Sequence, residues 1–150
     1  MTACCRRLPR RQMLLPRLRP LSTAAGVELS WSHLLRAPPE QPQPRDPVIV
    51  MHGLLGNKMN WRSLFRAGPL GELDRDVFVA DARNHGASPH HSEMHYDAMV
   101  DDVLRLLDEQ EIDRVVAVGH SMGGKTAMHL ALRAPDRVGR LVVCDIAPVV

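Results

Sequence analysis

Four short runs of apolar residues recur along the second part of this 150-residue chain. They lie at 48–51, 77–80, 115–118 and 141–144, and each contains at least two valines. These runs lack polar alternation, which is typical of strands that are buried on both faces, as in a parallel sheet. A looser alternation over 27–35 predicts a first strand ahead of them.

Two segments between these runs are predicted to be helices. In the first segment, apolar residues spaced at i, i+3, i+4 and i+7 form one face, and charged residues, Asp102 among them, form the other. The apolar residues are Tyr96, Met99, Val100, Val103, Leu106 and Leu107. The second helix is expected over 126–134 and ends near Pro135. Strands that alternate with helices predict an α/β fold with a mostly parallel, doubly wound sheet.

Two segments stand apart from this alternation. Residues 1–25 hold six arginines, interleaved leucines and no acidic residue, which is typical of a mitochondrial presequence. A disordered basic tail is the alternative, and no apolar core of a secretory signal follows the basic residues. Residues 37–47 contain five prolines and predict a loop. The folded domain is therefore expected over 26–150.

The composition excludes several classes of protein. No stretch approaches the roughly 18–20 apolar residues of a membrane span. The formal net charge is only +2, and after residue 25 the chain has 13 basic and 17 acidic side chains, which argues against a nucleic-acid partner. Three cysteines, two of them adjacent near the N-terminus, offer no disulfide framework.

Residues that could take part in catalysis or binding follow each apolar run directly. The four loops are 52–57 (HGLLGN), 81–88 (DARNHGAS), 119–126 (GHSMGGKT) and 145–148 (DIAP). The carboxyl ends of parallel strands meet at one edge of a sheet, and functional residues gather there. We therefore expect these loops to share one site.

The third loop fits two patterns. Gly119, Ser121 and Gly123 match G-x-S-x-G, the nucleophile elbow, in which a strained serine at a strand-to-helix turn requires small residues two positions before and after it. Residues 119–126 also match G-x-x-x-x-G-K-[ST], the P-loop that binds nucleotide phosphates. Both patterns need a strand, a loop and a helix, so the local sequence leaves the two interpretations open.

The loop at 52–57 favours an acyl hydrolase. A nucleotide-binding protein gives no role to His52 and Gly53 after an earlier strand. An acyl hydrolase needs a second amide donor for the oxygen of the tetrahedral intermediate. Gly53 lets the backbone turn, so the amide of Leu54 can face the site opposite the amide of Met122. His52 is expected to pack and to orient this loop.

The loops HGLLGN, DARNHGAS and GHSMGG, in this order and spacing, resemble the α/β-hydrolase superfamily over about residues 27–150, in particular mitochondrial serine hydrolases and bacterial esterases. The resemblance implies an α/β-hydrolase fold with strands up to about the sixth, Ser121 as nucleophile, and the amides of Leu54 and Met122 as oxyanion hole. It implies hydrolysis of acyl esters through an acyl-enzyme, plausibly of lipid-like esters such as diacylglycerols. It further implies a place in the mitochondrial matrix and association with the 2-oxoglutarate dehydrogenase complex. No cofactor or metal is expected.

Other candidates for the site are weaker. Asp145 ends the strand that follows the nucleophile helix, where some superfamily members carry the triad acid, although it could instead cap a helix. His120 is excluded as general base, because a side chain adjacent to the nucleophile points elsewhere and the base comes last in the chain order of this superfamily. Asp81 is expected to pair with its own loop and with Arg83. The loop histidines are expected to be solvated rather than metal ligands; they are His85, His90, His91 and His95.

The general-base histidine is absent from this chain, because the superfamily places it beyond the strands present here, as it does the lid over the acyl pocket. We therefore expect a truncated form that is poorly soluble and hydrolyses p-nitrophenyl esters negligibly. Two alternatives stay open: a non-catalytic pseudo-hydrolase or binding module of the matrix, and a nucleotide-binding protein with a P-loop at 119–126.

Overall fold

The computed structural model describes residues 26–35, 45–67 and 69–146. The expected presequence at 1–25 and most of the proline-rich loop at 37–47 lie outside these residues. None of the helices in the described ranges is long and apolar enough to cross a membrane.

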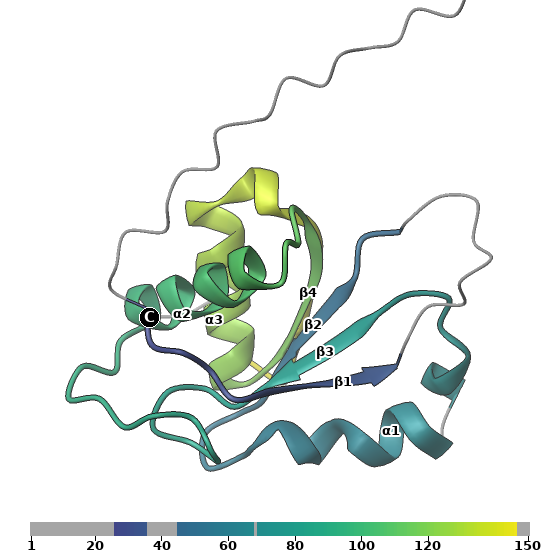
Figure 1. The fold of residues 1–150 in the computed structure, drawn as a ribbon, viewed down its shortest axis with the longest axis horizontal. Helices are drawn as coiled ribbons and strands as arrows, with labels where there is room; N and C mark the ends of the chain where they lie inside the picture. The colour runs from purple at the N-terminus through teal and green to yellow at the C-terminus, as the bar shows by residue number, and fades with distance from the viewer. Residues whose placement is uncertain (1–25, 36–44, 68, 147–150) are drawn as a thin grey trace, which may run out of the picture.

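Five strands form one sheet in the order β1-β3-β2-β4-β5 (Figure 1). β1 (Trp31–Leu35) pairs antiparallel with β3 (Val77–Ala80). The other neighbours are all parallel, and they are β3, β2 (Val48–Met51), β4 (Val115–His120) and β5 (Val138–Cys144). The mostly parallel sheet predicted from the valine-rich runs is therefore confirmed.

The strand ends differ from the prediction where neighbours add pairing. β4 extends two residues beyond its apolar run, because Gly119 pairs with Met51 of β2 and His120 pairs with Cys144 of β5. β5 begins at Val138, three residues before its apolar run. Hydrogen bonding to a neighbouring strand thus recruits residues that hydrophobicity alone does not mark.

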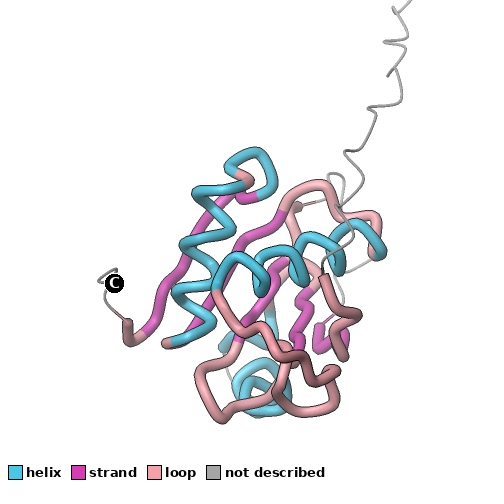
Figure 2. Tube along the Cα trace, turned by 90° about the vertical axis from the view of Figure 1, so that its left-hand side faces the viewer, coloured by secondary structure: helices cyan, strands magenta, loops and turns pink. Residues whose placement is uncertain are grey.

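Helices cover both faces of the sheet. α2 (Tyr96–Glu109) and α3 (Met122–Arg133) lie on one face, and α1 (Arg62–Ala67) lies on the other (Figure 1). In the view turned by 90°, β5 lies at one border of the sheet, beside α3 (Figure 2). Three short 3-10 helices complete the described elements: η1 (Lys58–Trp61), η2 (Pro69–Glu72) and η3 (Pro135–Arg137).

Alternate side chains of the buried strands pack into two separate hydrophobic cores, one on each face of the sheet. Ile49 and Met51 of β2 cluster with the apolar faces of α2 and α3. Val48 and Val50 point the other way and cluster with Phe65 of α1. Period-two alternation of a strand between two covered faces explains why these runs contain no polar residue.

The ends of α2 follow ordinary capping chemistry. At its start, the His95 side chain accepts a hydrogen bond from the amide of Ala98 at 3.2 Å. At its end, Glu111 adopts a left-handed φ of 56°, and the amide of Ile112 donates to the Leu107 carbonyl at 2.8 Å. This arrangement is a Schellman-type C-cap, in which glycine is the preferred residue at the left-handed position.

The helix that follows β4 starts earlier than predicted. α3 begins at Met122 rather than at 126, and it includes Gly123 and Gly124 in its first turn. Two glycines lower helix propensity, so the sequence pattern placed the start after them. In the structure, the close approach of this first turn to β2 outweighs that propensity, as described below.

Candidate active site

Ser121 occupies a strained turn between β4 and α3. Its backbone has φ 52° and ψ −116°, in a region that non-glycine residues avoid at a cost of order 1–3 kcal/mol. Two main-chain hydrogen bonds hold the turn: the Ser121 amide donates to the Cys144 carbonyl at 2.9 Å, and the Ser121 carbonyl accepts from the Lys125 amide at 3.0 Å. The serine is therefore held at the tip of the turn by β5 on one side and α3 on the other.

The glycines that flank Ser121 are required by contact with main-chain atoms. A Cβ on Gly119 would overlap the carbonyl of Gly123. A Cβ on Gly123 would come within 2.5 Å of the Met51 carbonyl oxygen and 2.7 Å of the His52 carbonyl oxygen. Since backbone cannot turn aside as a side-chain end can, this turn fits between β2 and β5 only with glycine at both positions.

The loop after β2 passes directly beside Ser121. The Gly123 amide donates to the His52 carbonyl at 3.1 Å, which joins the first turn of α3 to the start of this loop. A Cβ on Gly53 would lie 2.7 Å from Nδ1 of His120 and 3.3 Å from Cβ of Ser121, so Gly53 is the residue that permits this approach. The expectation that Gly53 serves a turn is thus better expressed as close packing against His120 and Ser121.

A cavity of about 330 Å³ opens at the junction of these elements. Ser121, Leu54 and Met122 all line it, so the structure brings together the predicted nucleophile and both predicted oxyanion-hole residues. The remaining lining is mostly apolar or aromatic and consists of Met94, His95, Tyr96, Met99, Lys125 and Ile146. The Met122 amide belongs to the first turn of a helix, where amides have no intrahelical acceptor and face positive helix-dipole potential.

His52 is buried, with 2% of its surface exposed, and both ring nitrogens have main-chain partners. Nδ1 donates to the Gly53 carbonyl at 2.8 Å, and Nε2 accepts from the Ala82 amide at 2.9 Å. Burial lowers the pKa of His52 below its ordinary value of 6.5, more than the Gly53 carbonyl raises it. The ring is therefore neutral at pH 7 and ties the loop after β2 to the loop after β3.

The four loop histidines do not share one environment, and the expectation that all are solvated is wrong for His85. His85 is 9% exposed; its Nδ1 donates to the Arg83 carbonyl at 2.9 Å and its Nε2 accepts from the Leu55 amide at 3.3 Å. His90, His91 and His95 are exposed. Among the described residues, no group of three or more metal-ligating side chains is close enough to hold a metal ion.

Asp81 pairs with Lys58, and not with Arg83 as expected. Its carboxylate accepts from the Lys58 amide and ammonium, each at 2.6 Å, and from the Ala87 amide at 2.9 Å. Burial alone would raise the pKa of Asp81, but these hydrogen bonds together outweigh it and lower the pKa. Gly86, at φ 54°, lies so close that a Cβ there would overlap the carboxylate. Asp81 thus anchors the loop after β3 to Lys58, which directly follows the loop at 52–57.

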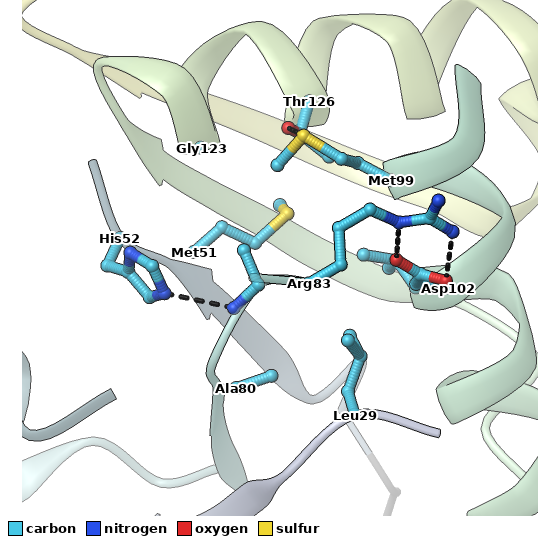
Figure 3. A pocket seen from close by; sticks show the side chains of 11 residues that line it. Leu29, Met51, His52, Ala80, Arg83, Met99, Asp102, Gly123 and Thr126 are labelled. Atoms are coloured by element: carbon cyan, nitrogen blue, oxygen red, sulfur yellow. Dashed lines mark hydrogen bonds and ion pairs between the residues drawn. The ribbon is translucent and has the colours of Figure 1, made fainter. Parts of the chain in front are cut away.

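Arg83 instead forms a fully buried pair with Asp102 of α2, and each side chain is 1% exposed (Figure 3). Two parallel hydrogen bonds of 2.7 Å join the guanidinium to the carboxylate. The sequence placed Asp102 on the polar face of its helix, which the structure contradicts. Arg83 also donates to the carbonyls of Glu93 and Ala98, both at 3.0 Å, and Asp102 accepts from the Val27 amide at 2.6 Å.

Behind the nucleophile helix, this pair borders a small void of about 20 Å³ that Met51 and Met99 also line (Figure 3). The signal in the sequence was indirect: Asp102 lies three residues after Met99 and four before Leu106, inside the apolar stripe of the helix. An acid in such a stripe requires a buried partner, but the sequence does not say that the partner follows β3.

Asp145 lies one residue beyond β5 and has a left-handed φ of 54°. Its carboxylate is 89% exposed and lies 3.6 Å from Nε2 of His120. His120 thus points toward Asp145 and over Gly53. Because the Cys144 carbonyl accepts from the Ser121 amide, the end of β5 and the nucleophile turn lie side by side.

Comparison with known proteins adds an independent line of argument. A family model described as the alpha/beta hydrolase fold matches residues 46–149. The sn-1-specific diacylglycerol lipase ABHD11 of Mus musculus is 51% identical over 102 residues, which cover 68% of this chain and 33% of that protein. Esterase YbfF of Escherichia coli is 44% identical over 105 residues, which cover 69% of this chain and 39% of that protein.

Solved structures agree with this family. A marine microorganism esterase superposes with a TM-score of 0.69 at 38% identity, covering 81% of this chain and 43% of that one. The chain spans about a third to two fifths of the length of the curated relatives named above. The family match includes both the loop after β2 and the strained turn at Ser121. The chain therefore belongs to the α/β-hydrolase fold family.

Proposed function

We propose that this chain carries the nucleophile and the oxyanion hole of a serine hydrolase that cleaves carboxylic esters through an acyl-enzyme on Ser121. The observation that carries the proposal is the strained φ of Ser121 at the mouth of a cavity that Leu54 and Met122 also line. Strain of this kind persists at functional sites because the surrounding structure enforces it.

In this proposal the ester carbonyl lies over Ser121, and the hydroxyl oxygen adds to the carbonyl carbon. The carbonyl oxygen then gains negative charge, which the amides of Leu54 and Met122 stabilise together with the N-terminus of α3. Loss of one oxyanion donor typically costs about 2.7–4 kcal/mol of transition-state stabilisation. His52, Gly53, Gly119 and Gly123 support this geometry through the contacts described above.

The tetrahedral intermediate collapses by breaking the ester C–O bond, which leaves the acyl group on Ser121 until water hydrolyses it. A base must take the Ser121 proton and return it to the departing alcohol. None of the described histidines is hydrogen-bonded to the Ser121 hydroxyl, and His120 is directed toward Asp145. We assign the general base to a histidine outside these 150 residues, with Asp145 as the proposed triad acid that orients it. The Ser121 amide donates to the Cys144 carbonyl, one residue before Asp145, and this proximity supports an acid at this edge of the site.

The substrate class follows from the lining of the cavity and from the relatives. Methionine, leucine and isoleucine side chains line most of the cavity, which suits an acyl chain. The mouse relative is named a diacylglycerol lipase and the bacterial relative an esterase. We therefore propose lipid-like acyl esters, diacylglycerols included, as substrates. The mitochondrial matrix and the 2-oxoglutarate dehydrogenase complex stay predictions.

The geometry of residues 119–126 favours the elbow over the P-loop. The segment is helical from Met122 onward, and the amides of Gly123 and Lys125 already donate to main-chain carbonyls. Thr126, which would help to hold a metal ion in a P-loop, is 1% exposed, and its hydroxyl donates to the Met122 carbonyl at 3.0 Å. These amides and this hydroxyl are thus engaged within the protein rather than directed at a phosphate.

The test is covalent labelling with a fluorophosphonate, with imidazole added as a soluble base. Peptide mapping by mass spectrometry should place the adduct on Ser121 and show that imidazole raises its rate. Ser121→Ala should abolish the adduct, whereas Ser63→Ala, at an exposed position of α1, should leave it unchanged. Wild-type protein that folds but stays unlabelled would favour the non-catalytic binding module. Mg²⁺-dependent ATP binding that Lys125→Ala abolishes would favour the P-loop.

A further inference from the structure

Two histidines join the loop at 52–57, which we call the oxyanion loop after its proposed role, to the loop after β3 by hydrogen bonds that run in opposite directions. His52, at the start of the oxyanion loop, accepts from the Ala82 amide in the second loop at 2.9 Å. His85, in the second loop, accepts from the Leu55 amide in the oxyanion loop at 3.3 Å. The two ring centroids lie 5.1 Å apart. The loops are therefore linked by a reciprocal pair of imidazole-to-amide hydrogen bonds.

The partners fix the tautomer of both rings. Nδ1 of His52 faces the Gly53 carbonyl and Nδ1 of His85 faces the Arg83 carbonyl, at 2.8 and 2.9 Å. A carbonyl oxygen can only accept, so each Nδ1 carries the hydrogen and each Nε2 is left as an acceptor. Both rings thus act as neutral imidazoles in the same tautomer.

These bonds determine where the Leu54 amide points. The Gly53 carbonyl is held by Nδ1 of His52 and by the Gly56 amide at 3.0 Å. In a planar trans peptide the carbonyl of one residue and the amide of the next point in opposite directions. Holding the Gly53 carbonyl therefore directs the Leu54 amide to the opposite side. His85 holds the following peptide in the same way, through the Leu55 amide.

The second peptide needs this support because its backbone is strained. Leu55 has a φ of 61°, and its side chain is 91% exposed, so no burial of the side chain offsets the strain. A left-handed conformation is sterically unfavourable for a non-glycine residue. Without an acceptor for its amide, Leu55 can return to a negative φ, which rotates the peptide next to Leu54.

We propose that His85 is a positioning residue of the oxyanion loop. Its Nε2 accepts from the Leu55 amide and thereby keeps the Leu54 amide directed toward Ser121. The first part of the proposal, that His85 holds the conformation of the loop, is independent of any activity. The second part, that this conformation aids catalysis, rests on the proposed function, in which the Leu54 amide is an oxyanion donor. The two parts are therefore tested by separate measurements on the same variants.

The first measurement is amide hydrogen exchange by NMR in the 150-residue protein. His85→Phe keeps a ring but removes the acceptor, whereas His85→Gln offers an amide oxygen near the position of Nε2. Loss of one net hydrogen bond of about 1 kcal/mol should speed exchange of the Leu55 amide about fivefold relative to Ile49 in the core. His85→Gln should restore much of this protection. His90→Phe, an exposed change in the neighbouring segment, should have no effect.

Two results of this experiment would overturn the proposal. One is a Leu55 amide that exchanges in His85→Phe no faster, relative to Ile49, than in the wild type. The other is a His85→Gln protein that loses protection as fully as His85→Phe, because the acceptor atom would then be irrelevant. A general loss of stability changes both amides together and leaves their ratio at the wild-type value, so it counts with the first result.

The second measurement is the rate at which the fluorophosphonate labels Ser121 with imidazole present. His85→Phe should lower the rate by at least about fivefold and by less than the 10²–10³-fold of a lost donor. His85→Gln should recover part of it. An unlabelled wild type would count against the proposed function alone, since exchange still reports the loop. If His85→Phe speeds exchange of the Leu55 amide but leaves the labelling rate of Ser121 unchanged, the positioning role is rejected.

Discussion

Replacing Gly123 by alanine tests how closely the nucleophile helix must approach the strand that carries the oxyanion loop. Gly123 lies in the first turn of α3, and its amide donates to the His52 carbonyl at 3.1 Å. An added Cβ would lie 2.5 Å from the Met51 carbonyl oxygen and 2.7 Å from that of His52. Both atoms belong to backbone at the end of β2, so neither can rotate aside.

The magnitude follows from these distances. Ordinary contact begins near 3.4 Å, so the helix and the strand must separate locally by about 0.9 Å. Overpacking of this kind costs about 1–3 kcal/mol, and loss of the Gly123 hydrogen bond adds about 1 kcal/mol. The higher helix propensity of alanine raises the free energy of unfolding by about 1 kcal/mol and so offsets part of this loss. We expect a net loss of about 1–3 kcal/mol in the free energy of unfolding.

Gly124→Ala is the matched control, because it is the same change one residue later in the same helical turn. There the closest atoms are the Cγ2 of Ile146 at 2.7 Å and the Cγ1 of Val143 at 3.1 Å, which are side-chain ends that can move, and the nearest backbone atom is the Gly119 carbonyl oxygen at 3.2 Å. We expect this variant to lose at least about 1 kcal/mol less than Gly123→Ala.

Urea unfolding followed by circular dichroism at 222 nm measures both variants against the wild type. Fluorophosphonate labelling of Ser121 should slow in Gly123→Ala as well, since α3 and the oxyanion loop are forced apart. Equal unfolding free energies for the Gly123→Ala and Gly124→Ala proteins would contradict this prediction. They would mean that the backbone of β2 yields as readily as a side chain.

Three further predictions concern the supports of the site. Arg83→Met leaves the buried Asp102 carboxylate unpaired and should cost about 3–5 kcal/mol in urea unfolding, whereas Arg83→Met with Asp102→Leu should recover part of that loss. His52 has a lowered pKa through burial, so as the pH falls below 6.5 the unfolded state takes up its proton first. Stability should therefore decrease between pH 7.5 and 5.5, and His52→Gln should show a smaller decrease in urea midpoint. Glu111→Gly relieves a left-handed residue at a helix end and should raise the unfolding free energy by about 0.5–1 kcal/mol.

Each of these has a clear contrary result. A double Arg83 and Asp102 variant no more stable than the single one would mean that the unpaired charge is not what destabilises. An unchanged pH dependence in His52→Gln would mean that this imidazole does not resist protonation in the folded state. A destabilised Glu111→Gly protein would show that contacts of the glutamate outweigh its backbone strain.

The sheet and the strained turn at Ser121 could both be recognised from the sequence alone. Runs buried on both faces contain no polar residue, so they can be recognised without knowledge of their neighbours, and β2 and β3 match their predicted bounds. The run at 141–144 departs from this expectation, because β5 lies at the border of the sheet and exposes Leu141 and Val142. The pattern around Ser121 was equally readable, because a strained turn that passes close to two strands tolerates only glycine at 119 and 123. Both signals are local along the chain.

The pairing of polar groups across the loops could not be read from the sequence and is visible only in the folded chain. Asp102 pairs with Arg83, Asp81 with Lys58, and His85 with the amide of Leu55, over separations of 19 to 30 residues. A polar side chain needs a hydrogen-bond partner when it is buried, but the sequence does not show which loop supplies that partner. The order of strands brings the loops together, and the backbone directions there decide which donor meets which acceptor. That choice is a property of the folded chain as a whole.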